Sequence, residues 1–437
     1  MFKNLNEELF AFVEKSPTSF HAIRTIEEYL GDAGFEHLKE GSEWNLKAGG
    51  SYYVTRNKSS VIAFRVPCKE FTGFHIAASH SDSPTLKIKE NPEMTVEGQY
   101  VKLNVEKYGG LICSPWFDRP LSVAGRVIVK NGNKLETKLV DVKRDVLMLP
   151  NLAIHLNRGV NEEGYKYNIQ KDMLPLFRMK DSTLDFKTMI AKEAGVDPEA
   201  IIGSDLFLYN RMPGTQWGAE NEFISAPRLD DLQCAFVSMK GFLSRKSDES
   251  VSVFCVMDNE EVGSGTKQGA GSTFLYDTLR RLNYSMGRTE EEYWTAVASS
   301  FMISGDNAHA VHPNYADMTD PTSRPYLNGG LVIKHSANQK YTTDAVSASV
   351  MRCLCERAGV PCQNFLNRSD LLGGSTLGNI SNAKVSLNTV DIGLPQLAMH
   401  SPYETAGAKD MAYTVKAFEE FFGSSIHVSE DGCFEIK

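Results

Sequence analysis

The sequence predicts an α/β protein, in which a central mixed, mainly parallel sheet flanked by helices is interrupted by a β-rich insertion. Apolar strand-like runs alternate with helical patterns before about residue 86 and after about residue 216, which is typical of a largely parallel sheet covered by helices. Residues 87–215 instead carry short alternating segments with few helical patterns. The 437 residues, 42% of them hydrophobic, suffice for two domains. We therefore expect one domain from 1–86 plus 216–437, and an insertion at 87–215.

The first half of the chain supplies the opening helices and strands. Residues 3–40 have a helical pattern that Pro17 breaks. Short apolar runs at 52–54, 61–64 and 74–78 predict strands, and the last is nearly continuous, as expected for a strand covered on both faces.

Two local signals stand out in the insertion. Asn131-Gly132 lies between alternating segments and predicts a tight hairpin turn. The stretch 183–195 predicts a helix.

The second half of the chain alternates between helices and strands. A helix follows Asp230, and further helices are expected near residues 274–282 and 343–358. Strands are expected in four segments, at 251–257, 299–303, 330–333 and 385–390.

Charge and hydropathy exclude several classes of protein. Lys and Arg number 46 against 55 Asp and Glu, so the net charge of −9 does not favour a nucleic-acid partner. No apolar run reaches the ~18 residues of a transmembrane helix. The first 15 residues resemble an amphipathic helix and not a signal peptide, so we expect a cytoplasmic protein.

Residues that bind metals follow several of the predicted strands. Histidine and carboxylate side chains occur in five clusters, at His80–Asp82, Asp230-Asp231, Asp258–Glu261, Asp306–His309 and His400. Ligands of open α/β sheets bind beyond the carboxyl ends of the strands. We therefore expect these distant segments to converge in one crevice.

The residue types indicate a divalent cation. Carboxylates with imidazoles and no cysteine suit zinc, cobalt or manganese. One catalytic ion needs three protein ligands, whereas two ions need about five with one shared. Asp82 can hold the His80 ring from behind. Of Glu260 and Glu261, one can bind metal and the other can take a proton from metal-bound water.

Each cluster alone also has an ordinary interpretation. A His-x-Asp pair can be a surface or capping pair, an acidic turn is common, and Asp230-Asp231 can cap a helix. His309 and His312 are spaced like a metal pair but rank lower, because Asp306 holds the strand end. Convergence at one sheet edge is what favours the metal site.

Longer motifs carry a family resemblance. They are SPTSFHA at 16–22, HSDSP at 80–84, NLAIH at 151–155, RLDDL at 228–232, DNEEVGS at 258–264, SGDNAHAVHPNY at 304–315, GGSTLG at 373–378 and PQLAMHS at 395–401. With these motifs the chain resembles the M18 aminopeptidases, the aspartyl-aminopeptidase group of zinc metallopeptidases, over nearly its whole length.

The resemblance implies a site with two divalent metal ions, zinc first and cobalt or manganese as alternatives. His80 and Asp306 would hold one ion, and Glu261 and His400 the other. Asp230 would bridge both ions.

The resemblance also implies roles in catalysis. Glu260 would be the general base for attack by metal-activated water, and Asp82 would orient His80. His155 would reach from the insertion, which would be the dimerisation domain, into a neighbouring subunit's site. The expected assembly is a homo-oligomer, a dodecamer built from dimers.

Three residues are expected at the substrate. Lys334 would lie near the pocket for the first side chain and could pair with an acidic residue, unless it is a strand-end lysine facing solvent. Gly374 and Ser375 would contact the peptide, since glycine allows close backbone approach.

The expected function is removal of the first residue from peptides, with acidic first residues as a candidate preference. Two other classes stay open at this point. A glycoside hydrolase also uses paired carboxylates, but it should ignore chelators. The other class is a metal- or peptide-binding scaffold without catalysis.

Overall fold

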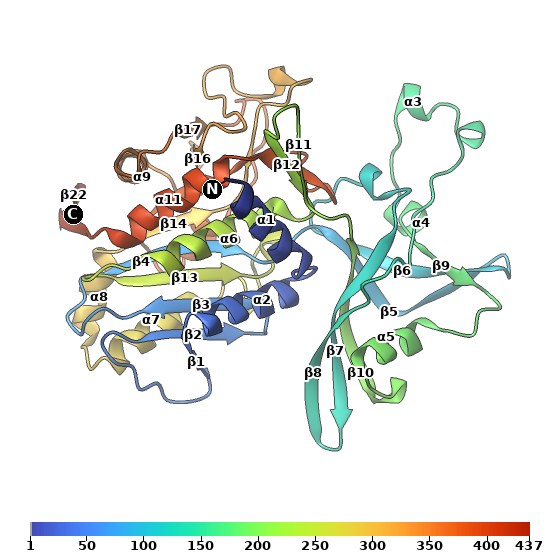
Figure 1. Cartoon of the computed structure of the whole chain (residues 1–437), viewed down its shortest axis with the longest axis horizontal. Coiled ribbons are helices and arrows are strands. Elements are labelled where there is room, and N and C mark those ends of the chain that lie inside the picture. The colour runs from blue at the N-terminus through green and yellow to red at the C-terminus, as the bar shows by residue number, and fades with distance from the viewer. Residues whose placement is uncertain (1) are drawn as a thin grey trace. The chain divides into compact units, whose positions relative to one another are not determined.

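The structure is a computed structural model that describes residues 2–437 and divides into two compact units. The first unit comprises the chain up to Asp82, Gly214–Met399 and Glu404–Lys437. The second comprises Ser83–Pro213 and His400–Tyr403. Helices and strands of both units are labelled in Figure 1. The predicted mixed α/β class is confirmed.

A nine-stranded sheet forms the centre of the first unit. In spatial order its strands are β1 (Glu36–Leu38), β2 (Ser51–Arg56), β3 (Ser60–Arg65), β13 (Val251–Met257), β4 (Phe74–His80), β14 (Phe301–Gly305), β18 (Asn388–Gly393), β16 (Leu331–Lys334) and β17 (Cys362–Phe365). β4 pairs in parallel with β13 and β14, and β14 pairs in parallel with β18. The pairs β2–β3, β3–β13 and β16–β18 are antiparallel, so the sheet is mixed.

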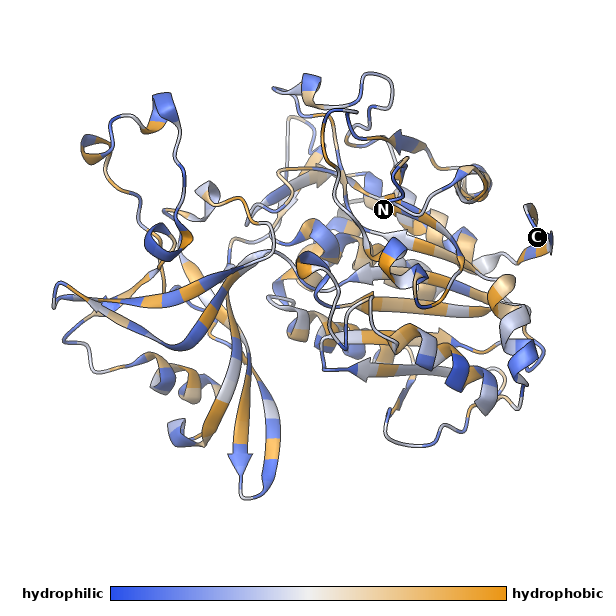
Figure 2. Ribbon diagram, turned by 180° about the vertical axis from the view of Figure 1, so that it is seen from behind, coloured by the Kyte–Doolittle hydropathy of each residue, from blue (hydrophilic) through white to orange (hydrophobic). Residues whose placement is uncertain are grey.

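Both faces of this sheet are buried. Along β13, Phe254 and Val256 belong to one hydrophobic core, whereas Val253 and Cys255 belong to another. Successive side chains of a strand point to opposite faces, so each core covers one face. The continuous apolar runs of β4 and β13 follow from this double covering, and hydrophobic stretches run along the strands in Figure 2.

Helices supply the outer layers of the first unit. They are α1 (Phe2–Glu14), α2 (Ser19–Asp32), α6 (Leu229–Ser244), α7 (Phe274–Ser285), α8 (Glu290–Ala298), α9 (Ala345–Ala358), α10 (Leu377–Asn382) and α11 (Asp410–Gly423). The core that contains Phe254 includes Phe236 of α6 and Phe421 of α11, whereas the opposite core includes Leu279 of α7 and Tyr293 of α8. Among the helices of residues 2–437, none combines the length and apolarity needed to cross a bilayer.

The helix predicted over 3–40 is wrong at its far end. α2 ends at Asp32, and Glu36–Leu38 form the edge strand β1. Gly34 has a φ of +79°, a left-handed conformation that ends a helix and that glycine adopts without strain.

Two later strands begin further along the chain than predicted, since β14 starts at Phe301 and β18 at Asn388. β14 starts late because α8, which the sequence analysis missed, runs to Ala298. Thr289 and Glu292 form the capping box of α8, a signal that was present in the sequence.

The second unit is built on a six-stranded sheet whose strand pairs are all antiparallel. Its order is β8 (Lys134–Asp141), β7 (Leu121–Asn131), β10 (Ile201–Asn210), β5 (Thr85–Val96), β6 (Tyr100–Tyr108) and β9 (Leu176–Met179). The predicted hairpin is confirmed, because Asn131 faces Lys134 across the turn and Gly132 has a φ of +59°. The predicted helix is α5 (Phe186–Ala194).

A small five-stranded sheet in the first unit was not predicted. Its order is β11 (Thr215–Trp217), β12 (Phe223–Ala226), β20 (Glu404–Gly407), β19 (Pro395–Leu397) and β15 (Ala308–His309). Strands of two to four residues are too short to show a period of two in the sequence. The remaining strands, β21 (Ile426–Glu430) and β22 (Cys433–Ile436), form a hairpin.

Candidate metal centre

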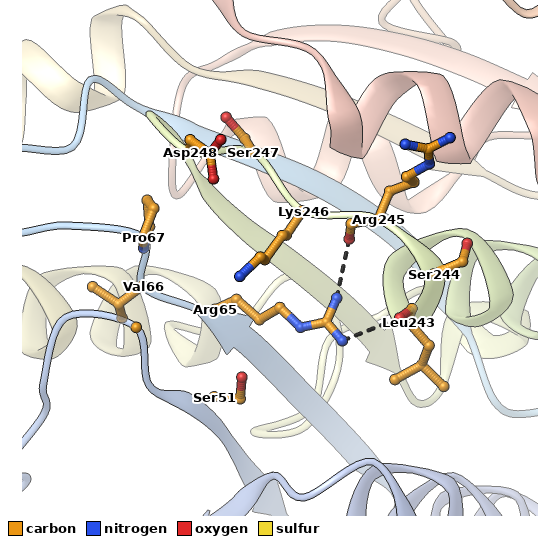
Figure 3. Close-up of a pocket in the computed structure, with 11 residues that line it drawn as sticks. Ser51, Arg65, Val66, Pro67, Leu243, Ser244, Arg245, Lys246, Ser247 and Asp248 are labelled. Atoms are coloured by element: carbon orange, nitrogen blue, oxygen red, sulfur yellow. Dashed lines mark hydrogen bonds between the residues drawn. The ribbon is translucent and has the colours of Figure 1, made fainter.

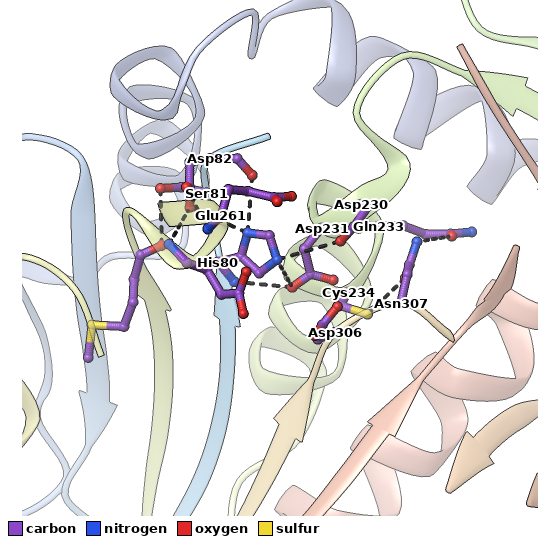
Figure 4. Close-up of polar contacts among 12 residues, drawn as sticks. His80, Ser81, Asp82, Asp230, Asp231, Gln233, Cys234, Glu261, Asp306 and Asn307 are labelled. Atoms are coloured by element: carbon purple, nitrogen blue, oxygen red, sulfur yellow. Dashed lines mark hydrogen bonds and ion pairs between the residues drawn. The ribbon is translucent and has the colours of Figure 1, made fainter. Parts of the chain in front are cut away.

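The parallel neighbours β13, β4 and β14 end at one edge of the main sheet. β4 ends at His80, and Asp306 directly follows β14. α6 brings Asp230 and Asp231 to the same place from its first turn. Ligand atoms of these four residues all lie within 4.8 Å of one another (Figure 4). The structure thus brings together three predicted ligands and Asp231, which was expected in the same crevice but not as a ligand.

The turn after β13 adds two carboxylates. His80, Glu260 and Glu261 form a second group with ligand atoms within 4.8 Å of one another. The backbone N–H groups of Glu260 and Glu261 donate to the two carboxylate oxygens of Asp82, at 3.1 and 3.2 Å. Asp82 therefore holds the turn that carries both glutamates.

His80 is oriented from both sides of its ring. Its Nδ1 lies 3.1 Å from the backbone oxygen of Asp82 and 3.4 Å from the carboxylate Oδ1 of that residue. Its Nε2 lies 3.5 Å from Asp230 Oδ1, and its backbone N–H donates to Asp231 Oδ2 at 3.1 Å. Asp82 stands where a carboxylate that orients a metal-binding imidazole is needed.

Like charges are crowded at this edge. Burial raises the pKa of Asp231 well above its ordinary range, and the neighbouring Asp306 and Asp230 add to that rise. Burial also raises the pKa of Glu260 to about 8. Carboxylates packed this closely resist ionisation unless a cation offsets their charge.

The donor set fits a divalent cation. Asp231 is fully buried, and its Oδ1 has no hydrogen-bond partner among the described residues. Such an atom is expected to face a cation or water. The only ligand types in the two groups are carboxylate and imidazole, which suit zinc, cobalt or manganese. The nearby thiol of Cys234 donates to Asn307 Oδ1 at 3.0 Å.

Two predicted histidines belong to the second unit. His400 has a φ of +68°, and its Nδ1 lies 3.0 Å from the backbone oxygen of Gly110. His155 is exposed on a short 3₁₀ turn, Ile154–Leu156. Their roles as metal ligand and as a residue for a neighbouring site stay predictions. His309, which ranked lower, is exposed and packs near the ring of Phe365.

Lys334 ends β16 and is 3% exposed, so the alternative of a solvent-facing lysine is wrong. Its Nζ lies 3.4 Å from Asp306 Oδ2. Burial alone would lower the pKa of Lys334. The negative charge of Asp306, with smaller contributions from Tyr341 and Asp391, outweighs this effect and raises the pKa above its ordinary value. The lysine is thus a buried cation beside the carboxylate cluster.

The predicted substrate loop is exposed at Gly374 and Ser375. A Cβ on Gly374 would meet nothing within 4 Å, whereas one on Gly373 would lie 2.3 Å from the Asn367 amide. The Asn367 side chain is flexible at its amide end and can move aside, so packing within the described residues requires a glycine at neither position.

A cavity of about 410 Å³ lies at the opposite end of the strands (Figure 3). It is lined by Arg65 of β3, which pairs with Ser252 at the start of β13. The Arg65 guanidinium donates to the backbone oxygens of Leu243 and Arg245. Arg65 therefore caps the end of α6, and this cavity takes no part in the metal centre.

Comparisons with known proteins identify the family. The family model described as "Aminopeptidase I zinc metalloprotease (M18)" matches residues 12–422. The "Probable M18 family aminopeptidase 2" of Clostridium novyi (strain NT) is 47% identical over 423 residues, which cover 95% of this chain and 98% of that protein.

Solved structures share the fold. A chain of the Ape4 and Nbr1 complex is 35% identical, with a TM-score of 0.93, and the match covers 97% of this chain and 86% of that chain. The S. cerevesiae mApe1 dodecamer is 28% identical, with a TM-score of 0.84 and coverage of 96% and 97%. This chain belongs to the M18 family of aminopeptidases.

Proposed function

We propose that this chain is a metal-dependent exopeptidase that holds two divalent cations and removes the first residue of peptides, with Glu260 as its general base. The observation that carries the proposal is the cluster of the buried His80, Asp230 and Asp231 with the partly buried Asp306, beside the Glu260–Glu261 turn. The glycoside hydrolase and scaffold alternatives are not favoured, because the family match is to peptidases.

The proposed ligands divide between two cations. His80 and Asp306 hold one, Glu261 and His400 the other, and Asp230 bridges them. The proximity of His80, Asp230 and Asp306, and of Glu261 to His80, supports this division. When bound, such cations polarise a carbonyl group and lower the pKa of water. Zinc is the proposed native ion, because the family is described as zinc metalloproteases.

The chain's own residues then move one proton. Glu260 takes a proton from the attacking water on a carboxylate oxygen and returns it to the nitrogen of the leaving amine. Without cations, burial raises the pKa of Glu260 to about 8, and bound cations would lower it again. A group whose pKa lies near the operating pH can act first as base and then as acid. Asp82 fixes the turn that carries Glu260 through the two backbone N–H groups.

Chelation tests this proposal. Dialysis against EDTA should reduce the release of p-nitroaniline from aminoacyl-p-nitroanilides to background, and added zinc, cobalt or manganese should restore it. The reason is that the cluster supplies ligands, carboxylates and an imidazole, but no metal ion that would polarise the scissile carbonyl group. Activity that survives complete removal of metal, checked by elemental analysis, would favour the hydrolase alternative.

We also propose that Lys334 favours an acidic first residue. It is a buried cation next to the proposed ligand Asp306. With the Asp306 carboxylate engaged as a ligand, the Lys334 ammonium would be available to pair with a carboxylate of the substrate. Asp and Glu p-nitroanilides should then be cleaved faster than Leu and Lys p-nitroanilides. Lys334→Met should lose this preference while it keeps cleavage of the Leu substrate. Equal selectivity in both proteins would contradict the assignment.

The proposed assembly is a homo-oligomer, and a dodecamer built from dimers is its expected form. One structural neighbour is a dodecamer. In the second unit, Leu152, Ile154 and Leu156 around His155 are 57%, 46% and 74% exposed. Apolar side chains exposed in a row are typical of an interface between subunits. Light scattering after size exclusion should give a multiple of the chain mass, and Leu156→Glu should lower it, whereas Leu135→Glu, 61% exposed on β8, should not.

A further inference from the structure

A buried chain of hydrogen bonds joins the two loops that carry Asp230 and Asp306. Glu404 Oε2 accepts the backbone N–H of Asp230 at 3.0 Å. Glu404 Oε1 accepts from Gln396 Nε2 at 3.4 Å, and Gln396 Oε1 accepts from Asn307 Nδ2 at 2.7 Å. Glu404, Gln396 and Asn307 are each 1% exposed. This series of hydrogen bonds therefore connects the backbone of Asp230 to the side chain of Asn307, the residue that follows Asp306.

At its Asn307 end, this series of hydrogen bonds is held by two residues of α6. Asn307 Nδ2 also donates to Gln233 Oε1 at 3.2 Å, and its Oδ1 accepts the thiol of Cys234 at 3.0 Å. Both halves of the Asn307 amide are thus engaged, which sets the direction of donors and acceptors along the whole chain.

The small sheet supplies the frame for these contacts. Ala226 of β12 faces Glu404 of β20 and lies just before the loop that holds Asp230. Ala308 of β15 faces Pro395 of β19, next to Gln396. Backbone pairing therefore fixes both loops, and the side chains of Glu404 and Gln396 span the gap between them.

We propose that Glu404, acting through Gln396 and Asn307, is a positioning residue that sets the spacing of Asp230 and Asp306 and thereby the affinity for the divalent cation that these two residues would hold with His80. The inference rests on the proposed two-cation function. A carboxylate suits the first position because both of its oxygens accept, from the Asp230 backbone and from the Gln396 amide. Groups that hold metal ligands in place typically contribute 10- to 100-fold in metal affinity.

The variant Glu404→Gln tests the order of donors and acceptors in this series of hydrogen bonds. An amide at 404 can accept from Asp230, but its NH₂ group then faces the NH₂ group of Gln396. Turning the Gln396 amide moves the mismatch to Asn307, whose oxygen already accepts from Cys234. We expect the affinity for one of the two Co²⁺ ions, the one that His80, Asp230 and Asp306 would hold, to fall by about 10- to 100-fold, measured by competition with a chromophoric chelator. The visible absorption spectrum of the Co²⁺ protein should change with it.

The double variant Glu404→Gln/Gln396→Glu is the matched rescue. It moves the carboxylate to position 396, where it can accept from the amides at 404 and 307, while the amide oxygen at 404 accepts from Asp230. Affinity should return to within a few-fold of the wild type. The exposed Glu43 gives the control Glu43→Gln, which should change nothing.

The outcomes separate this inference from the proposed function. A wild-type chain that binds no divalent cation overturns the proposed function and this inference with it. A wild-type chain that binds two, beside a Glu404→Gln variant with unchanged affinity and spectrum, overturns the inference alone, as does a loss that the double variant fails to recover. If Glu404→Gln does not fold, Gln396→Met, which removes the middle link and leaves Glu404 on Asp230, is measured by the same criteria.

Discussion

Replacing Glu260 with glutamine should lower kcat by about 10²- to 10⁴-fold, the usual contribution of a general acid–base group. The amide has the shape of the carboxylate but cannot take up a proton at neutral pH. The backbone N–H of residue 260 should still donate to Asp82, so the turn should keep its form. The ratio of kcat to metal content, from p-nitroanilide turnover and elemental analysis of the same sample, measures the effect.

The control for this variant is Glu43→Gln, on an exposed side chain. It should match the wild type in turnover and in metal content. Should Glu260→Gln keep full turnover with both ions bound, another group must act as the base. Should it lose metal instead, Glu260 is a ligand, and the roles of Glu260 and Glu261 are exchanged.

Asp230→Asn should have the second large effect, a loss of the second cation. A buried charge that loses its partner costs about 3–5 kcal/mol, so the affinity for that ion should weaken by about 10³-fold. The amide cannot bridge two cations with two anionic oxygens. Titration with Zn²⁺ against a competing chelator should give one equivalent in place of two.

The same variant should behave in the opposite way without metal. Removing one negative charge from the cluster relieves repulsion with Asp231 and Asp306. In EDTA the Tm of Asp230→Asn should therefore exceed that of the wild type by about 2 °C or more. With Zn²⁺ the order should reverse, because binding stabilises the wild type more. Asp32→Asn, on an exposed side chain at the end of α2, serves as control. Equal Tm values for the wild type and Asp230→Asn in EDTA would show that repulsion among these carboxylates does not destabilise the metal-free protein.

Strands buried on both faces were the most predictable part of this fold. β4 and β13 are apolar at nearly every position, so their runs are visible without any partner. His80 and Asp306 followed from their places directly after such strands, since parallel strands end at one edge. The ends of elements were less predictable because caps decide them, as Gly34 and Thr289 do here.

The contact of Asp231 with His80 and that of Glu404 with Asp230 could not be found in this way. In the sequence, Asp231 looks like the second acid of a helix cap, and only its buried place beside His80 shows otherwise. Glu404 is far from Asp230 in the sequence, and the short strand that carries it has no periodicity to reveal it. Contacts between distant short segments depend on tertiary packing, which leaves no local pattern.

The first unit is built from separate segments of the chain, and this affects how it folds during synthesis. Both strands that pair with β4, β13 and β14, follow Pro213 in the sequence and so come after the whole continuous part of the second unit. While the chain emerges from the ribosome, the second unit can fold, whereas both edges of β4 stay unpaired until β13 and β14 have been synthesised. Unpaired apolar strands are prone to aggregate, and pairings between distant segments form slowly. Nascent chains should therefore depend on chaperones until β14 has been synthesised, even though the finished protein buries every residue of β4.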